Sequence, residues 1–131
     1  MDLNTSKLKS LAKRYGLRLV IVFGSQAQGH IDAESDIDIA FVPSRAIDEQ
    51  QLYEELVHLL KRADIDLVNI YTTHNHLLRF EIFHNGKVWY EAEPGIKSRM
   101  EWESYFDYVD FKRYYDMMDE LLDKKIARMT T

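Results

Sequence analysis

Two aspartates one residue apart inside an apolar run constrain this chain more than any other feature. The run is "DIDIAFV", from Asp36 to Val42, and its alternation is typical of a β-strand that ends at Pro43. Side chains two residues apart lie on the same face of a strand, so Asp36 and Asp38 project together. Two such carboxylates raise each other's pKa unless a cation lies between them. The pattern therefore predicts a site for magnesium or manganese, which prefer oxygen ligands.

The segment before this run predicts a phosphate site. Residues 17–23, "LRLVIVF", are rich in β-branched residues and predict a strand that ends at Gly24. Gly24 allows a close backbone approach, and "SQAQ", from Ser25 to Gln28, can begin a short helix whose free N–H groups face an anion. A hydroxyl such as that of Ser25 can donate to a phosphate oxygen. Because magnesium commonly shares substrate phosphate oxygens, the two halves together favour a nucleotide.

A third carboxylate is expected from the later strand "DIDLVNIY", residues 64–71. Asp66 lies inside the apolar run and could accept a proton from an attacking hydroxyl or ligate a second metal. Asp64 begins the strand and is interpreted as a capping residue.

The remaining pattern predicts one α+β domain spanning residues 1–131, with a small mixed β-sheet flanked by helices. A helix starts at Thr5 or Ser6 and stops before Gly16. Further segments are a helix over 48–63, a short helix before a turn at Asn85-Gly86, a last strand through Tyr90, and a long helix from about Lys97.

Composition excludes several classes. The chain has no cysteine, so it has no thiolate zinc site and no cysteine nucleophile. Its formal net charge of −5 argues against a non-specific nucleic-acid binder, which needs a basic surface. The longest apolar run, residues 19–23, is too short to span a bilayer, and the first residues do not resemble a signal peptide. We therefore expect a cytoplasmic protein without a membrane or a direct nucleic-acid partner.

These residues resemble a known family. Gly24-Ser25, ten intervening residues, then Asp36-Ile37-Asp38 and a later acidic strand residue are similar to the DNA polymerase beta-like nucleotidyltransferases. The chain looks most like the minimal nucleotidyltransferases (MNT), the antitoxin partners of HEPN toxins. The resemblance covers most of the chain, including "VIVFGSQAQG", "LLRFEIFHNGKVWYE" and the tyrosine-rich C-terminal helix.

The resemblance implies a magnesium-dependent enzyme that transfers AMP from ATP to a hydroxyl, in particular a tyrosine hydroxyl, of a cognate HEPN toxin and so neutralises it. In that family pattern Gly24 and Ser25 would hold the triphosphate, Asp36 and Asp38 the metals, and Asp66 would be the base or a third ligand. A hetero-oligomer with the toxin is expected.

One position departs from the pattern. Many relatives have a basic residue where this chain has Gln28, which can hydrogen-bond a phosphate but adds no charge. Arg45, Arg79 or Lys87 could compensate, and sequence spacing does not choose among them. His30 lies in the loop between the two half-motifs and is interpreted as a solvated histidine, although it could approach a base or ribose. The pair His74 and His76 lacks a third ligand at a regular offset, so zinc is not favoured.

The C-terminal segment, residues 97–129, carries more apolar side chains than one face can bury. Helical spacing predicts one stripe that packs in the core: Trp102, Tyr105, Phe106, Val109, Tyr114, Tyr115, Met118, Leu121 and Leu122. Tyr108 and Phe111 fall off that stripe, and the extra aromatics are either buried as well or meet another protein.

Two alternatives to the enzymatic antitoxin remain at this point. The first is a binding antitoxin that occludes its toxin and keeps the nucleotide fold as a scaffold. The second is a small-molecule nucleotidyltransferase, which would ordinarily need an added substrate domain. A template-directed polymerase is least consistent with the chain, which shows neither a basic groove nor a template-gripping domain.

Overall fold

The computed structural model describes residues 5–24 and 36–130. In chain order the elements are α1 (Thr5–Tyr15), β1 (Leu17–Phe23), β2 (Ile37–Pro43), α2 (Glu49–Leu60), β3 (Ile65–Asn69), the 3-10 turn η2 (Ile70–Thr72), α3 (His76–Asn85), β4 (Lys87–Glu91) and α4 (Ile96–Thr130). The predicted alternation of helices and strands is confirmed, and η2 is the element that the sequence pattern did not predict.

The strands form one mixed sheet in the order β3-β2-β1-β4. β1 pairs antiparallel with both β2 and β4, whereas β2 and β3 are parallel. The prediction of an α+β fold with a small mixed sheet and a long C-terminal helix is therefore confirmed. Gly16 makes the tight connection from α1 into β1 with a φ of +68°, a conformation that glycine adopts without steric cost.

Each face of the sheet buries its own apolar cluster. Alternate β2 side chains Ile37, Ile39 and Phe41 pack with α1 and α2, while Ala40 and Val42 pack with α3 and the start of α4. This alternation is the expected period of a strand covered on both faces. At the end of the sheet where β1 stops and β2 starts, Val22 and Ile37 belong to the first cluster and Phe23 packs against the second.

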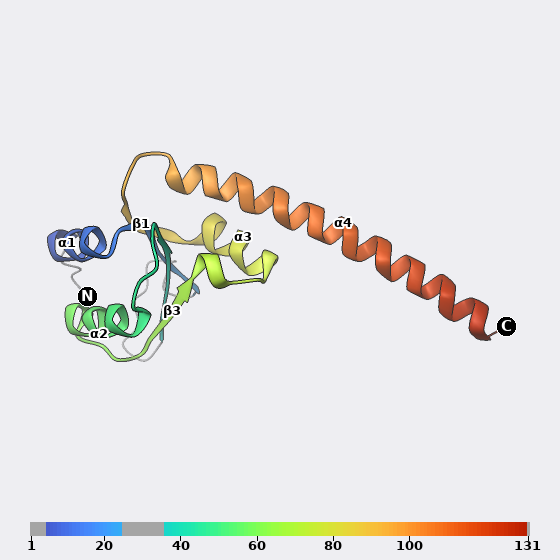
Figure 1. Ribbon diagram of the computed structural model, residues 1–131, viewed down its shortest axis with the longest axis horizontal. Helices are drawn as coiled ribbons and strands as arrows, with labels where there is room; N and C mark the ends of the chain where they lie inside the picture. The colour runs from blue at the N-terminus through green and yellow to red at the C-terminus, as the bar shows by residue number, and fades with distance from the viewer. Residues whose placement is uncertain (1–4, 25–35, 131) are drawn as a thin grey trace.

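Helix α4 extends far beyond the sheet. Its 35 residues make it about 50 Å long at 1.5 Å per residue, and its second half projects away from the other elements (Figure 1). The buried positions Ile96, Met100 and Ser104 all lie in its first three turns. From residue 110 to residue 130 every residue of α4 is exposed. We call residues 112–130 the overhang.

The predicted core stripe of α4 is wrong. Trp102 and Phe106 are 61% and 57% exposed, because the face that packs on the body recurs at positions 96, 100 and 104 and then at Tyr108 and Phe111. Tyr108 stacks on Phe80 at 6.0 Å, and Phe111 contacts His76 at 4.7 Å between ring centroids. Both residues interpreted as lying off the stripe therefore contact α3, and of the predicted stripe Tyr105 does so too, at 5.6 Å from Phe80.

Among the described residues, no helix has both the length and the apolar character needed to cross a membrane.

Candidate active site

The strand register brings two of the predicted carboxylates side by side. Asp38 is the second residue of β2 and pairs with Phe23 of β1 on one side and with Asp66 of β3 on the other. Because paired residues of neighbouring strands point to the same face, Asp38 and Asp66 project together. Their face is that of Ala40 and Val42, the face on which α3 and α4 pack.

Asp36 immediately precedes β2 at the same end of the sheet. The backbone N–H of Ile37 donates to the carbonyl oxygen of Asp64 at 2.9 Å, which fixes the start of β2 against the start of β3. Asp36 and Asp66 are exposed, and Asp38 between them is half-buried. The structure therefore brings together all three aspartates that the sequence analysis selected.

The electrostatics of Asp38 reflect this crowding. Partial burial raises the pKa of its carboxyl above the usual range, and the negative charges of Asp66 and then Asp36 raise it further. A cation bound among these carboxylates would remove the repulsion that raises this pKa. Three carboxylates that repel one another in this way form a set of oxygen donors that suits a hard divalent ion.

The carboxylates are not yet arranged around one point. Within residues 5–24 and 36–130, no three acidic or histidine side chains lie in positions that would hold a metal ion. Binding an ion here would require side chains of Asp36 or Asp66, both exposed, to turn toward Asp38.

Gly24 lies against Asp38. A Cβ atom added to Gly24 would lie 2.4 Å from Oδ2 of Asp38, and the residue has a φ of +73°. A side chain at position 24 would therefore both strain the backbone and displace the carboxylate. The predicted importance of Gly24 thus has a structural reason that the sequence did not reveal: the glycine makes room for Asp38.

Ser25, Gln28 and His30 lie outside the described residues, so their predicted roles stay predictions.

The cations considered as substitutes for a basic residue at position 28 lie in different places. Arg45 follows the far end of β2, where its guanidinium donates to the carbonyl oxygen of Arg14 at 2.8 Å, so it is remote from Asp38. Lys87 pairs with Val22 and so begins β4 at the site end of the sheet. Arg79 lies on α3, and within the described part of the chain its buried Nε has no hydrogen-bond partner.

The sequence analysis missed Arg62, which forms an ion pair with Asp64, the fourth acidic residue of the region. Its Nε donates to Oδ1 of Asp64 at 2.8 Å, and a second nitrogen bonds Oδ2 of the same carboxylate. These bonds hold the pKa of Asp64 below its usual range. Asp64 is therefore neutralised, which agrees with its exclusion from the predicted metal ligands. No sequence signal distinguished Arg62 from other surface arginines.

Of the two neighbouring histidines, His76 packs within the fold. His76 begins α3 after the N-cap Asn75, whose side chain accepts from the N–H of Leu78 at 3.1 Å. Its ring packs on Phe111. Within the described part of the chain, His74 and His76 do not belong to any group of three side chains that could hold a metal ion.

Comparison with known protein families decides what this arrangement belongs to. Residues 6–94 match the family described as polymerase beta, nucleotidyltransferase. The chain belongs to the polymerase beta nucleotidyltransferase family. The match contains the whole sheet and all three aspartates, and it ends before α4.

Solved structures share the fold of this nucleotidyltransferase along nearly their whole length. A chain of a toxin–antitoxin complex with AMP-PNP has a TM-score of 0.72 and 24% identity, covering 92% of this chain and 99% of that one. A chain of the tri-AMPylated Shewanella oneidensis HEPN toxin in complex with MNT antitoxin has a TM-score of 0.66 and 22% identity, covering 92% and 97%. A comparison with curated proteins finds no match.

A third structure is a mutant of the MntA–HpeT toxin–antitoxin complex in which two aspartates, two positions apart, are replaced by glutamate. Its chain has a TM-score of 0.71 and 22% identity, covering 92% of this chain and 99% of that one. At these identities the likeness shows the fold.

Proposed function

We propose that this nucleotidyltransferase is an antitoxin that transfers AMP from ATP to a hydroxyl group, in particular a tyrosine hydroxyl, of a cognate HEPN toxin. The observation that carries the proposal is the register of β2 on β3, which sets Asp38 beside Asp66 with Asp36 adjacent. Such a carboxylate cluster at one end of a sheet suits metal-assisted phosphoryl chemistry better than it suits a structural role.

The similar structures support the acceptor and the nucleotide. One contains AMP-PNP, an ATP analogue, and another contains an AMPylated HEPN toxin beside its MNT antitoxin. In the mutant complex the two replaced aspartates have the same spacing as Asp36 and Asp38.

In the proposed reaction a toxin hydroxyl oxygen attacks the α-phosphorus of ATP. The bond from that phosphorus to the oxygen bridging to the β-phosphate breaks, and pyrophosphate leaves. Asp66, which is exposed, would take the hydroxyl proton, and the alternative role for it is that of a third metal ligand. Gly24, Ser25 and Gln28 would orient the triphosphate.

Asp36, Asp38 and Asp66 would hold the magnesium or manganese ion. When bound, such an ion supplies positive charge to the phosphate oxygens and makes pyrophosphate a better leaving group. Without that charge the three carboxylates would repel the triphosphate, so we infer that nucleotide binding needs the divalent ion.

Helix α4 supplies the surface that we propose for the toxin. Exposed aromatic and aliphatic side chains cover it, among them Trp102 and Phe106 on the outer side and Leu121 and Leu122 on the overhang. Apolar surface of this extent is typical of a protein interface. The same observation favours the second candidate function, an antitoxin that neutralises its toxin by occlusion alone.

The experiment that tests the proposal is label transfer to the co-encoded partner. With magnesium and ATP labelled at the α-phosphorus, we expect the partner to become labelled, whereas ATP labelled at the γ-phosphorus should leave it unlabelled. Label from the γ-phosphate would mean phosphorylation. No label from either, with the partner still bound and inactive, would favour occlusion.

A further inference from the structure

The end of the sheet where β2 and β3 begin carries four aspartates, although the proposed metal site uses three. Asp38 pairs with Asp66 in the parallel register, and Asp36 and Asp64 lie two positions earlier in the same two segments. Residues two apart on a strand share a face, and neighbouring strands lie about 4.8 Å apart. The four positions therefore form two successive rows, and Asp64 differs from the other three in its contact with Arg62.

The guanidinium of Arg62 contacts both carboxylate oxygens of Asp64. Its Nε donates to Oδ1 at 2.8 Å, and a second nitrogen donates to Oδ2. Two such bonds fix the orientation of a carboxylate as well as balancing its charge. The side chain of Arg62 is only 11% exposed, whereas the partners of a weak surface ion pair are freely solvated. Asp64 is therefore already held by a cation of its own chain.

The backbone that carries this ion pair is fixed by neighbouring elements. Lys61 ends α2 in the left-handed region, with φ 56° and ψ 37°, where the chain turns toward β3. The hydroxyl of Tyr53 in α2 donates to the carbonyl oxygen of Ala63 at 2.6 Å. From β2, the N–H of Ile37 donates to the carbonyl oxygen of Asp64 at 2.9 Å. The fold therefore sets the position of the pair from two sides.

A fourth free carboxylate would change what the site binds. It would cancel one unit of the positive charge that a bound ion offers to phosphate oxygens, and it could take a coordination position that a phosphate needs. Mg²⁺ is usually held by one or two carboxylates together with water and substrate phosphates, whereas Ca²⁺ accepts about six to eight oxygen ligands. A more crowded set of carboxylates therefore favours calcium and disfavours the triphosphate.

We propose that Arg62 is a positioning residue for AMP transfer: by holding Asp64, it limits the metal site to Asp36, Asp38 and Asp66 and so favours Mg²⁺ with a bound triphosphate over Ca²⁺. Arg62 acts through Asp64 and does not contact the reacting atoms. The inference rests on the proposed function, because it presupposes the carboxylate site. Its test is therefore a binding measurement that needs neither nucleotide nor toxin.

The test is Mn²⁺ binding to the full-length chain, followed by electron paramagnetic resonance with Mg²⁺ and Ca²⁺ as competitors. Arg62→Met keeps the length of the buried stem but donates no hydrogen bond, so it releases Asp64. This variant should bind Mn²⁺ at least about threefold more tightly than the wild type, because affinity rises with the number of charged ligands. Ca²⁺ should also become a stronger competitor relative to Mg²⁺.

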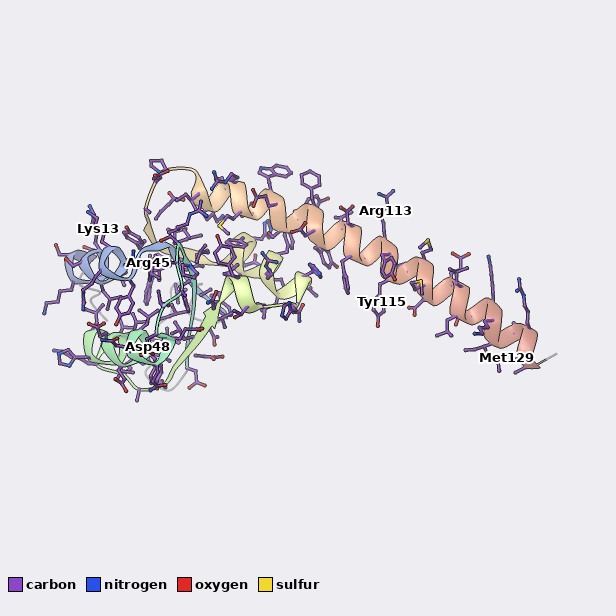
Figure 2. All side chains as sticks on the ribbon, in the orientation of Figure 1. Lys13, Arg45, Asp48, Arg113, Tyr115 and Met129 are labelled. Atoms are coloured by element: carbon purple, nitrogen blue, oxygen red, sulfur yellow. The ribbon has the colours of Figure 1, made fainter. Side chains whose placement is uncertain are left out.

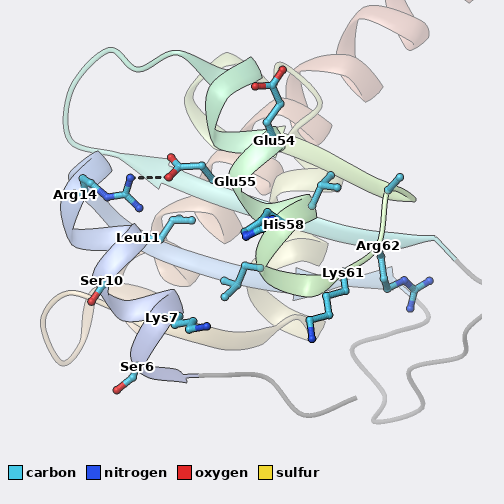
Figure 3. A pocket seen from close by; sticks show the side chains of 13 residues that line it. Ser6, Lys7, Ser10, Leu11, Arg14, Glu54, Glu55, His58, Lys61 and Arg62 are labelled. Carbon is cyan, nitrogen blue, oxygen red and sulfur yellow. Dashed lines mark hydrogen bonds and ion pairs between the residues drawn. The ribbon is translucent and has the colours of Figure 1, made fainter.

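Two matched variants separate the release of Asp64 from a general change in charge. Lys61 and Arg62 both extend from the end of α2 (Figure 3). Lys61→Gly removes the same charge without freeing Asp64, and glycine suits the left-handed backbone. Arg62→Met combined with Asp64→Asn removes both members of the ion pair. Each of these two variants should bind Mn²⁺ within about twofold of the wild type, as a double-mutant cycle on a specific pair requires.

Asp64→Asn keeps the proposal testable even if melting curves show that Arg62→Met is unfolded. It should lower the Mn²⁺ affinity less than about threefold, whereas Asp38→Asn should lower it at least about tenfold, because Asp38 alone of the two is a ligand. Equal losses in these two variants, or no gain in a folded Arg62→Met, would overturn the proposal and leave AMP transfer standing. No Mn²⁺ binding by any chain would contradict the carboxylate site itself, and this inference with it.

Discussion

The body of the molecule (the sheet with α1, α2 and α3) and the overhang of α4 contain the same kinds of apolar residues, which are buried in the body and exposed on the overhang. In the body, side chains such as Leu52 and Phe83 have no exposed surface. In the overhang, Tyr115, Met118 and Leu122 continue the face that packs at Phe111, yet they are 57%, 45% and 54% exposed, because none of the other described elements packs on them (Figure 1). Figure 2 shows Arg113, Tyr115 and Met129 projecting from α4 beyond the body. The difference shows that a hydrophobic stripe on a helix does not reveal whether the same chain or another protein packs against it.

Under the proposed function the body carries out the chemistry and α4 binds the partner, and the largest expected effect concerns the body. Asp38→Asn should lower AMP transfer by at least about a thousandfold, since it removes a charged ligand from the carboxylate cluster. Thermal stability should stay equal or rise slightly, because like-charge repulsion with Asp66 and Asp36 is relieved. Label-transfer rates and melting curves measure the two effects. Retained transfer would remove Asp38 from the site.

A matched pair of leucines tests the difference in burial. Leu52→Ala in α2 should lower the free energy of unfolding by about 2–5 kcal/mol, because it opens a cavity in the core. Leu122→Ala in the overhang should change it by less than about 0.5 kcal/mol, as expected for an exposed position. Urea denaturation of both variants provides the measurement. Equal losses would mean that the overhang is buried in solution.

The overhang should matter more than the body for the affinity of the chain for its toxin. Replacing Leu121 and Leu122 together by alanine should weaken binding of the toxin about 10- to 100-fold, in the range expected when exposed apolar anchors of an interface are truncated. Binding kinetics on immobilised toxin measure this change. Lys9→Ala, on the body, serves as the control and should leave the affinity unchanged. An unaffected double variant would place the toxin elsewhere.

The smallest effect concerns the contact between α1 and α2. Burial, together with the hydrogen bond and negative charge of Glu55, raises the pKa of Tyr15 to about 12 from its usual 10. A raised pKa means that the contribution of this group to stability is complete below pH 10 and is lost as the pH rises through 12. Tyr15→Phe should cost about 1 kcal/mol at neutral pH and remove this alkaline dependence. Melting temperatures between pH 8 and pH 12 test both expectations.

The sequence predicted most of the local structure and the composition of the site. The strand alternation around Asp38 and the apolar run around Asp66 were enough to select carboxylates that lie at one end of the sheet, because strand geometry converts spacing directly into a shared face. The pairing of Asp38 with Asp66 depends on the parallel register of β2 and β3, which the sequence does not state. The contact of Gly24 with Asp38 and the neutralisation of Asp64 by Arg62 likewise depend on tertiary packing.

Helix α4 shows where the prediction was wrong and why. Aromatic residues occupy more than one side of this helix, so helical spacing alone admits several stripes. The phase is set by the few side chains that meet α3, such as Phe111 on His76, and a long-range contact of that kind is not visible in the sequence.

The most direct test of the division between body and α4 is intact-protein mass spectrometry of the co-encoded toxin, run on the same samples as a binding assay. The toxin is incubated with magnesium-ATP and either the wild-type chain or the Asp36→Asn, Asp38→Asn double variant. We predict that the wild type adds mass in increments of AMP, whereas the double variant binds the toxin with unchanged affinity and adds no mass. Equal AMP addition by both chains, or no addition by the wild type while the complex forms, would contradict the account.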